Sequence, residues 1–222
     1  MENKSAYAYE TIKEMILNGT LPPLSDVSEK KLQEQLQCSR TPVHEAIKQL
    51  ESENLVITYP RKGTFITDVT IEMVRDLYET RLLLEPSITR QAVSSASKEW
   101  LLDLRSRLQV EHAMETHEDI LAVMALDTEL HTGIAALCDN LYLRNTLRVV
   151  YEHDRRIRLK TERNVDQVRF SQKEHVRILD AMIDGDADKT EALSREHVEH
   201  SRDLTFESLG FRNNNFYTKT TL

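Results

Sequence analysis

Three histidines and one aspartate in the second half of the chain have the residue types and spacing of a metal site. Asp127 and His131 stand four residues apart, so on a helix they share a face and can bind one ion together. His175 begins a run of apolar residues at helical spacing, and His197 lies on the last predicted helix. Three imidazoles and one carboxylate suit Zn, Ni, Co, Mn or Fe and leave coordination positions open. Each histidine taken singly also fits an ordinary hydrogen-bonded core residue.

A second group of polar residues has the pattern of a DNA-reading helix. The polar turn Cys38–Thr41 leads into Pro42, which suits the first turn of a helix because the amide that it lacks would have no partner there. Val43, Ile47 and Leu50 recur at helical spacing and predict a buried stripe. Arginine can donate two hydrogen bonds to guanine, and serine and threonine can hold phosphates. The residues expected against DNA are Ser39, Arg40, Thr41, His44 and Lys48.

The segments on either side of this helix predict a winged helix-turn-helix. Upstream, residues 28–37 predict a helix with Ser28 as its N-cap, and Lys30 on it is also expected to meet DNA. Downstream, residues 55–59 and 64–67 predict two strands of a hairpin. The basic tip of this hairpin, Arg61, Lys62 and Gly63, is placed to meet phosphates or the minor groove. A small helix-turn-helix that docks a protein is the alternative.

From Thr70 onward the sequence predicts helices only. Helices are expected over about 70–92, 98–115, 117–138, 140–163, 168–184 and 187–209, with Pro86 implying a kink or a break in the first. The fold class is therefore mainly α: three helices and a small hairpin, then an antiparallel bundle of six or seven helices. The predicted domains are residues 1–69 and 70–212, followed by a polar tail over 213–222.

Composition restricts the class of protein further. A length of 222 residues fits two modest domains, and 40% hydrophobic content supports a packed core. The net charge of −8 argues against nonspecific coating of nucleic acid but not against a local basic DNA-reading face. Cys38 and Cys138 are far apart and predict no disulfide. With no signal peptide and no apolar run that could span a bilayer, we expect a cytoplasmic protein with no membrane partner.

The first domain resembles the DNA-binding domain of the GntR family of bacterial transcription regulators. The resemblance covers residues 5–67 and is carried by Ser39–Val43, Glu45–Ala46, Leu50, Leu55–Val56 and Gly63. The chain departs from the family's pattern at two positions. His44 stands where the family has an arginine that touches DNA, which changes the expected operator. Asn54 stands where glycine is usual, a mild change because asparagine tolerates the left-handed conformation that ends a helix.

Residues 70–209 resemble the FCD ligand-sensing domain of the FadR subgroup of that family. The residues carrying this resemblance are Tyr78–Glu79, Arg81, Glu85, Asp127, His131, Asn140, Glu174–His175, Ile178, Ala181, Gly185–Asp186 and His197. The resemblance implies that Asp127, His131, His175 and His197 are the ligands of one divalent transition metal, Zn or Ni, Mn or Fe. It places His197 rather than His200 in the ligand register.

The resemblance implies an organic carboxylate as effector, coordinated to that metal. Arg81 lies near the pocket by resemblance, although an ion pair with Glu85 four residues on is the interpretation we favour for it. The cationic run from Arg155 to Lys160 usually forms a solvated helix face, but Arg155 or Arg158 can turn inward to pair with an anionic effector.

The implied protein is a homodimeric transcription regulator, most often a repressor, that binds a palindromic operator on double-stranded DNA and is controlled by a small molecule. Three alternatives stay open at this point. A three-histidine, one-aspartate site can activate water in a metal-dependent hydrolase, although no general base is evident and the DNA-binding head would be unexplained. The metal ion itself can be the signal, or it can be purely structural.

Overall fold

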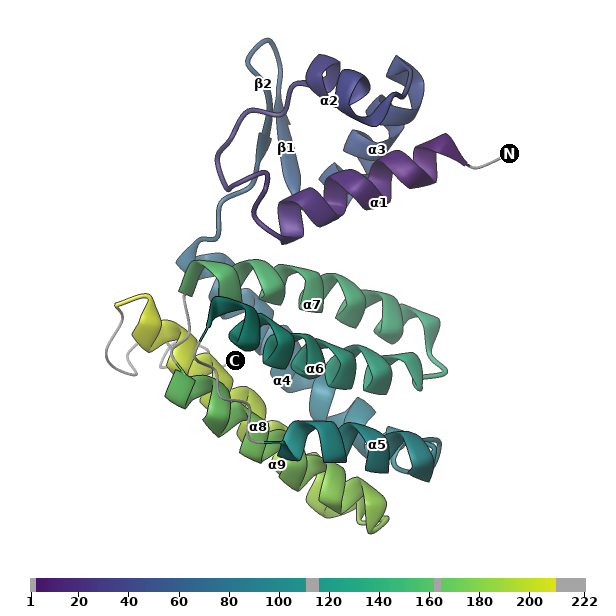
Figure 1. Ribbon diagram of the computed structural model, residues 1–222, viewed down its shortest axis with the longest axis vertical. Helices are drawn as coiled ribbons and strands as arrows, with labels where there is room; N and C mark the ends of the chain where they lie inside the picture. The colour runs from purple at the N-terminus through teal and green to yellow at the C-terminus, as the bar shows by residue number, and fades with distance from the viewer. Residues whose placement is uncertain (1–2, 111–115, 162–164, 211–222) are drawn as a thin grey trace, which may run out of the picture. The chain divides into compact units, whose positions relative to one another are not determined.

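A computed structural model describes residues 3–110, 116–161 and 165–210 and divides the chain into two compact units (Figure 1). The first unit comprises the residues up to Leu77 together with Glu152–Lys160, and the second comprises Tyr78–Tyr151 and the residues from Thr161 onward. The predicted polar tail, residues 213–222, lies outside the described residues. None of the helices in the described ranges is long and apolar enough to cross a bilayer.

The first unit contains the predicted three helices and hairpin. The elements are α1 (Lys4–Leu17), α2 (Glu29–Leu36), α3 (Arg40–Ser52), β1 (Val56–Tyr59) and β2 (Gly63–Ile66). Ile12 on α1 and Val43 and Leu50 on α3 are fully buried in one apolar core, which leaves the opposite side of α3 in solvent. The predicted winged helix-turn-helix architecture is confirmed.

Local sequence explains where the short elements begin and end. The Ser28 side chain caps α2 by accepting a hydrogen bond from the amide of Lys31, as its residue type predicts. Asn54 has φ of 58°, so the left-handed conformation expected after α3 is present. The hairpin is antiparallel, with Val56 opposite Ile66 and Tyr59 opposite Gly63, which leaves Arg61 and Lys62 in the connecting turn.

A buried ionic cluster lies within the first unit. Lys13 on α1 is buried and forms ion pairs with Glu53 at 2.9 Å and Glu152 at 2.7 Å. Burial alone would lower the pKa of Lys13, but hydrogen bonds to Glu152, Tyr9 and Glu53 outweigh burial and raise its pKa. The cluster therefore keeps its charges paired away from water, as a buried ion must be to persist.

The second unit contains the α-helical bundle. Its helices are α5 (Lys98–Gln109), α6 (His117–Ala136), α8 (Val165–Ile183) and α9 (Ala187–Ser208), with most of α4 (Ile71–Ala92) and the first half of α7 (Leu141–Thr161). The described residues from Thr70 onward thus contain six helices, within the predicted range. The core includes Leu104, Leu130, Leu147 and Leu179, each fully buried and each from a different helix.

Two expectations about helix ends need correction. Helix α5 stops at Gln109 instead of continuing to residue 115, because Val110 adopts an extended backbone, a conformation that β-branched residues favour. Residues 111–115 themselves lie outside the described residues. Helix α8 begins at Val165, three residues earlier than expected.

Helix α4 runs through Pro86 as a single helix, so the break that we considered does not occur. Proline has no amide hydrogen to donate to the carbonyl four residues earlier, which here belongs to Leu82. Arg195 on α9 donates a hydrogen bond from Nη1 to this Leu82 carbonyl at 3.4 Å. The Arg195 side chain, from another helix, therefore donates a hydrogen bond to the carbonyl for which the proline has no amide hydrogen.

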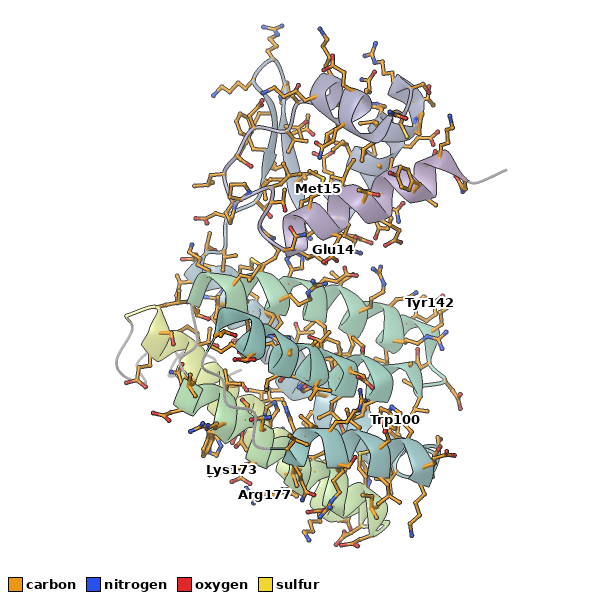
Figure 2. The ribbon with its side chains drawn as sticks, viewed as in Figure 1. Glu14, Met15, Trp100, Tyr142, Lys173 and Arg177 are labelled. Atoms are coloured by element: carbon orange, nitrogen blue, oxygen red, sulfur yellow. The ribbon has the colours of Figure 1, made fainter. Side chains whose placement is uncertain are left out.

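Helices α5 and α6 approach closely at one glycine. A Cβ atom added to Gly133 on α6 would lie 2.5 Å from Cζ2 of Trp100, so only glycine fits at this position. Trp100 lies on α5 and is labelled in Figure 2. Its indole is thus packed on the α6 backbone two residues beyond His131.

Candidate metal centre and candidate DNA-binding surface

His175 and His197 form the centre of the candidate metal site. They lie on α8 and α9, and both are buried, with exposed fractions of 0% and 2%. Their Nε2 atoms are 3.1 Å apart. Because α8 and α9 are neighbours joined by the short turn at Gly185–Asp186, the two imidazoles meet at the same depth inside the second unit.

Helix α6 adds the other two predicted residues. Oδ1 of Asp127 lies 3.4 Å from Nε2 of His175 and 3.9 Å from Nε2 of His131. One ring nitrogen from each of the three histidines lies within 4.8 Å of the others. The structure therefore brings together all four residues that the resemblance implied as ligands.

The two distances at His175 fit a shared ion, whereas the 3.9 Å between His131 and Asp127 is longer than the same geometry gives. Ligand atoms that surround one transition metal at about 2.1 Å, at angles of about 90–110°, are about 3.0–3.4 Å apart. The 3.1 Å between His175 and His197 and the 3.4 Å between His175 and Asp127 fall within this range. Three imidazoles and one carboxylate are also the donor set that Zn²⁺ and its neighbours in the first transition row accept.

Glu174 determines which nitrogen of His197 is available. Its Oε2 atom lies 2.9 Å from Nδ1 of His197, and a carboxylate can only accept, so Nδ1 carries the proton. The Nε2 atom of a neutral His197 then presents a lone pair toward His175 and the centre of the cluster. Burial, followed by the proximity of His175, holds the pKa of His197 well below 6.5, so the ring is neutral, as metal coordination requires.

Further carboxylates support the histidines from outside the cluster. The second oxygen of Glu174 accepts from Nδ1 of His200, so His200 binds Glu174 and does not face the three clustered rings. On the other side, Oε2 of Glu85 lies 3.6 Å from Nδ1 of His131. Metal-binding histidines usually carry such a carboxylate on the nitrogen that faces away from the ion. The sequence pattern alone predicted this supporting role for neither Glu174 nor Glu85.

The three candidate effector-binding arginines all have acidic partners. Arg81 is buried, pairs with Glu85 and lies with its guanidinium 5.2 Å from the centre of the Tyr78 ring. Within the first unit, Arg155 pairs with Glu14 at 2.9 Å. Arg158 is likewise buried there and pairs with Asp154 at 2.9 Å, four residues earlier on α7. The ion pair favoured for Arg81 is present, and effector binding by any of the three stays a prediction.

The candidate DNA-binding surface lies on the first unit. All nine residues predicted to meet DNA are exposed: Lys30, Ser39, Arg40, Thr41, His44, Lys48, Arg61, Lys62 and Gly63. Ser39 is the N-cap residue of α3, yet its side chain makes no capping hydrogen bond to that helix. Its hydroxyl can therefore face a phosphate. His44 is held at 3.1 Å from Oε1 of Glu29, a contact between α3 and α2 that the sequence did not predict.

Comparison with known families agrees with both halves of the molecule. Residues 4–66 match the model of the bacterial regulatory proteins of the gntR family, and residues 76–200 match the FCD domain. The chain belongs to the GntR family of transcription regulators and carries a C-terminal FCD domain. The proteins of this class are regulators and not enzymes, so a metal-dependent hydrolase is not favoured.

Individual relatives are similar over most of their length. The Nta operon transcriptional regulator of Aminobacter aminovorans is 29% identical over 197 residues, which is 89% of this chain and 92% of that protein. The HTH-type transcriptional regulator YdhC of Bacillus subtilis is 26% identical over 86% of this chain and 84% of its own length. The solved structure of Escherichia coli McbR/YncC shares the fold with a TM-score of 0.79 at 19% identity, covering 94% of this chain and all of that one.

Proposed function

We propose that this regulator binds a palindromic operator as a homodimer and senses a small organic carboxylate at a divalent metal in its FCD domain. The observation that carries the effector part is the buried cluster of His131, His175 and His197 with Asp127 beside it. Residues 1–69 would read DNA, and residues 70–212 would sense the effector.

The chemistry of the cluster supports the effector class. Four protein ligands leave one or two positions open on a metal that accepts five or six, and a carboxylate oxygen is a suitable additional ligand for Zn, Ni, Mn or Fe. Asp127, His131, His175 and His197 would hold the ion, which would supply a positive charge for the acid. Glu85 contacts both Arg81 and His131. Of the three candidate arginines, Arg81 is therefore the one best placed to help the metal hold the acid.

Assignment to the FadR subgroup and action as a repressor are the finer parts of the proposal. An HTH-type transcriptional repressor of Escherichia coli, RspR, is 21% identical over 86% of this chain, which favours repression. Effector binding would change operator affinity only if the acid binds the DNA-competent and DNA-incompetent states with different affinities. The same coupling must then appear in the effect of operator on acid binding.

The decisive experiment measures operator binding with and without acid. The full-length protein is loaded with Zn²⁺, and anisotropy titrations on its own promoter fragment are repeated with a panel of short organic acids, after chelation, and in His197→Ala. Thr132→Ala changes an exposed residue beside His131 and is the matched control.

We expect at least one acid to shift operator affinity in the wild type and in Thr132→Ala, and no acid to do so after chelation or in His197→Ala. A response that survives both would place the effector elsewhere and leave the metal structural. A response to chelation alone, with no acid active, would make the ion itself the signal.

A further inference from the structure

Two buried polar side chains on α8 have no hydrogen-bond partner for one atom each within the described residues. They are Oγ of Ser171 and Nε2 of Gln172, on side chains whose residues are 5% and 8% exposed. Buried hydroxyl and amide groups almost always have partners, so each exception requires an explanation. Neither residue belongs to the four expected ligands or to the carboxylates behind them.

The position of these two residues on α8 provides that explanation. Three or four residues after them comes His175, which contacts Asp127 on α6. Three or four residues before them comes Val168, which packs in a small apolar cluster with Val123 on α6. Ser171 and Gln172 therefore lie on the stripe of α8 that faces α6, one helical turn before the ligand His175.

The opposite side of α8 is turned to solvent. Lys173 and Arg177 are exposed, and Figure 2 shows both labelled side chains pointing away from the bundle. The two unpartnered groups are thus on the inner side of the same helix, bounded by the Val123–Val168 contact at one end and by the candidate metal ligands at the other.

We propose that Ser171 and Gln172 form a second subsite of the effector pocket, a proposal that rests on the proposed function. The amide nitrogen of Gln172 donates hydrogen bonds, and the hydroxyl of Ser171 can donate or accept, so together they suit an oxygen atom of the ligand. One helical turn rises about 5.4 Å. The effector class is therefore a short organic acid with a second oxygen function, a carboxylate, hydroxyl or oxo group, about 5 Å from the carboxylate on the metal.

This subsite would determine specificity among acids. A monocarboxylate of the same length places a methyl group where Gln172 needs an acceptor, so it leaves the buried amide without a partner. Sites built to hydrogen-bond a polar group discriminate strongly against analogues that lack it, whereas an extra methylene changes affinity much less. We expect the Zn²⁺-loaded protein to prefer a dicarboxylate to its monocarboxylate counterpart by about tenfold or more.

The experiment compares matched acids on matched variants. Calorimetric titrations of Zn²⁺-loaded full-length protein use dicarboxylates of three to six carbons, such as succinate, each paired with the monocarboxylate of equal length, such as butyrate. The variants are Gln172→Leu, Ser171→Ala and, as control, the exposed neighbour Lys173→Ala. The melting temperature of each variant is also measured without metal and without acid.

We expect Gln172→Leu to abolish the preference between paired acids while its melting temperature without acid stays equal to the wild type or rises, because leucine removes a buried amide nitrogen that has no hydrogen-bond partner within the described residues. Ser171→Ala should reduce the preference in part, and Lys173→Ala should leave it unchanged. A lower melting temperature of Gln172→Leu without acid would show a structural residue and overturn the proposal.

The remaining outcomes distinguish failure of the subsite from failure of the proposed effector. If the wild type binds both members of every pair equally, or if Gln172→Leu retains the preference, water satisfies the Ser171 and Gln172 groups. Either outcome would overturn the subsite but not the proposal that a carboxylate binds the metal. Binding of none of the acids by the Zn²⁺-loaded wild type would overturn the proposed effector and the subsite together.

Discussion

Glu174 on α8 and Nδ1 of His197 on α9 are joined by a 2.9 Å hydrogen bond, and this bond turns the unprotonated Nε2 of His197 toward His175. The carboxylate thereby fixes both the orientation and the tautomer of the ring before any ion arrives. A site prepared in this way loses less conformational freedom on binding metal than one whose rings must first be ordered.

Glu174→Gln should therefore weaken metal binding by about 10- to 100-fold, because the amide can present its NH₂ group to His197 and no longer stabilises one tautomer. Competition between the protein and a fluorescent Zn²⁺ chelator measures the affinity. Glu196→Gln alters a partly exposed carboxylate adjacent to His197 that pairs with Arg177, and it should leave the affinity unchanged. Equal affinities in all three proteins would assign Glu174 no role at the centre.

Loading with metal should stabilise the protein against heat. The expected ligands come from α6, α8 and α9, so an ion would link three helices that separate on unfolding. Free Zn²⁺ at 100 times its Kd adds about 2.7 kcal/mol, which corresponds to a rise in Tm of about 5–10 °C for a protein of this size. Differential scanning calorimetry before and after chelation tests this, with His131→Ala/His175→Ala as the variant that should show no rise. A rise of the same size in that double variant would place the ion elsewhere.

Arg40→Ala should remove sequence-specific operator binding while leaving the fold intact, because Arg40 is exposed at the first turn of α3. A lost arginine–guanine contact costs about 1–3 kcal/mol, and the proposed dimer would lose two such contacts. Fluorescence anisotropy at fixed salt, with Arg177→Ala on α8 as a control for the loss of one surface charge, measures the effect. Unchanged operator affinity would show that Arg40 does not belong to the DNA-binding surface.

Acid should destabilise the metal-free protein through His153. Burial, the largest cause, lowers the pKa of His153 below 6.5, and its Nε2 lies 2.8 Å from the carbonyl oxygen of Glu53. Below pH 6.5 the unfolded chain binds a proton that the folded state does not. The free energy of unfolding therefore rises with pH between the folded pKa and 6.5, and this stabilisation is lost as the pH falls through that range. Urea unfolding from pH 7.5 to 5 should show this slope, and His153→Gln should reduce it, leaving the part that the buried His197 contributes. An identical slope in His153→Gln would assign the pH dependence to other groups.

The sequence predicted the elements well because their signals are local. The spacing of Val43, Ile47 and Leu50 indicates the buried side of α3, and the turn residues around Arg61 indicate the hairpin tip. Helix α4 is less predictable at Pro86, since whether a proline breaks a helix depends on distant residues such as Arg195, which here reaches the Leu82 carbonyl.

The candidate site was predicted only as far as the resemblance extended. Periodicity alone left His131, His175 and His197 open to a core role, and the family pattern brought them together. Glu174 belonged to that pattern, but its role behind His197 was not predicted, and Ser171 gave no signal at all. Glutamate and serine are usually exposed, and their burial here follows from the packing of α8 on other helices. The burial of Lys13 was unpredictable for the same reason. Its sequence context is that of a surface lysine, and its partner Glu152 is 139 positions away along the chain.

The close approach of Trp100 to Gly133 has a practical consequence. Trp100 is the single tryptophan of the chain, and its ring rests on the α6 backbone two residues beyond His131. Intrinsic fluorescence excited at the red edge of the protein spectrum therefore originates from one place, beside the helix that carries two of the four expected ligands. A titration with metal or with an organic acid can be followed optically in the unlabelled wild-type protein, with the emission of this indole as the reporter.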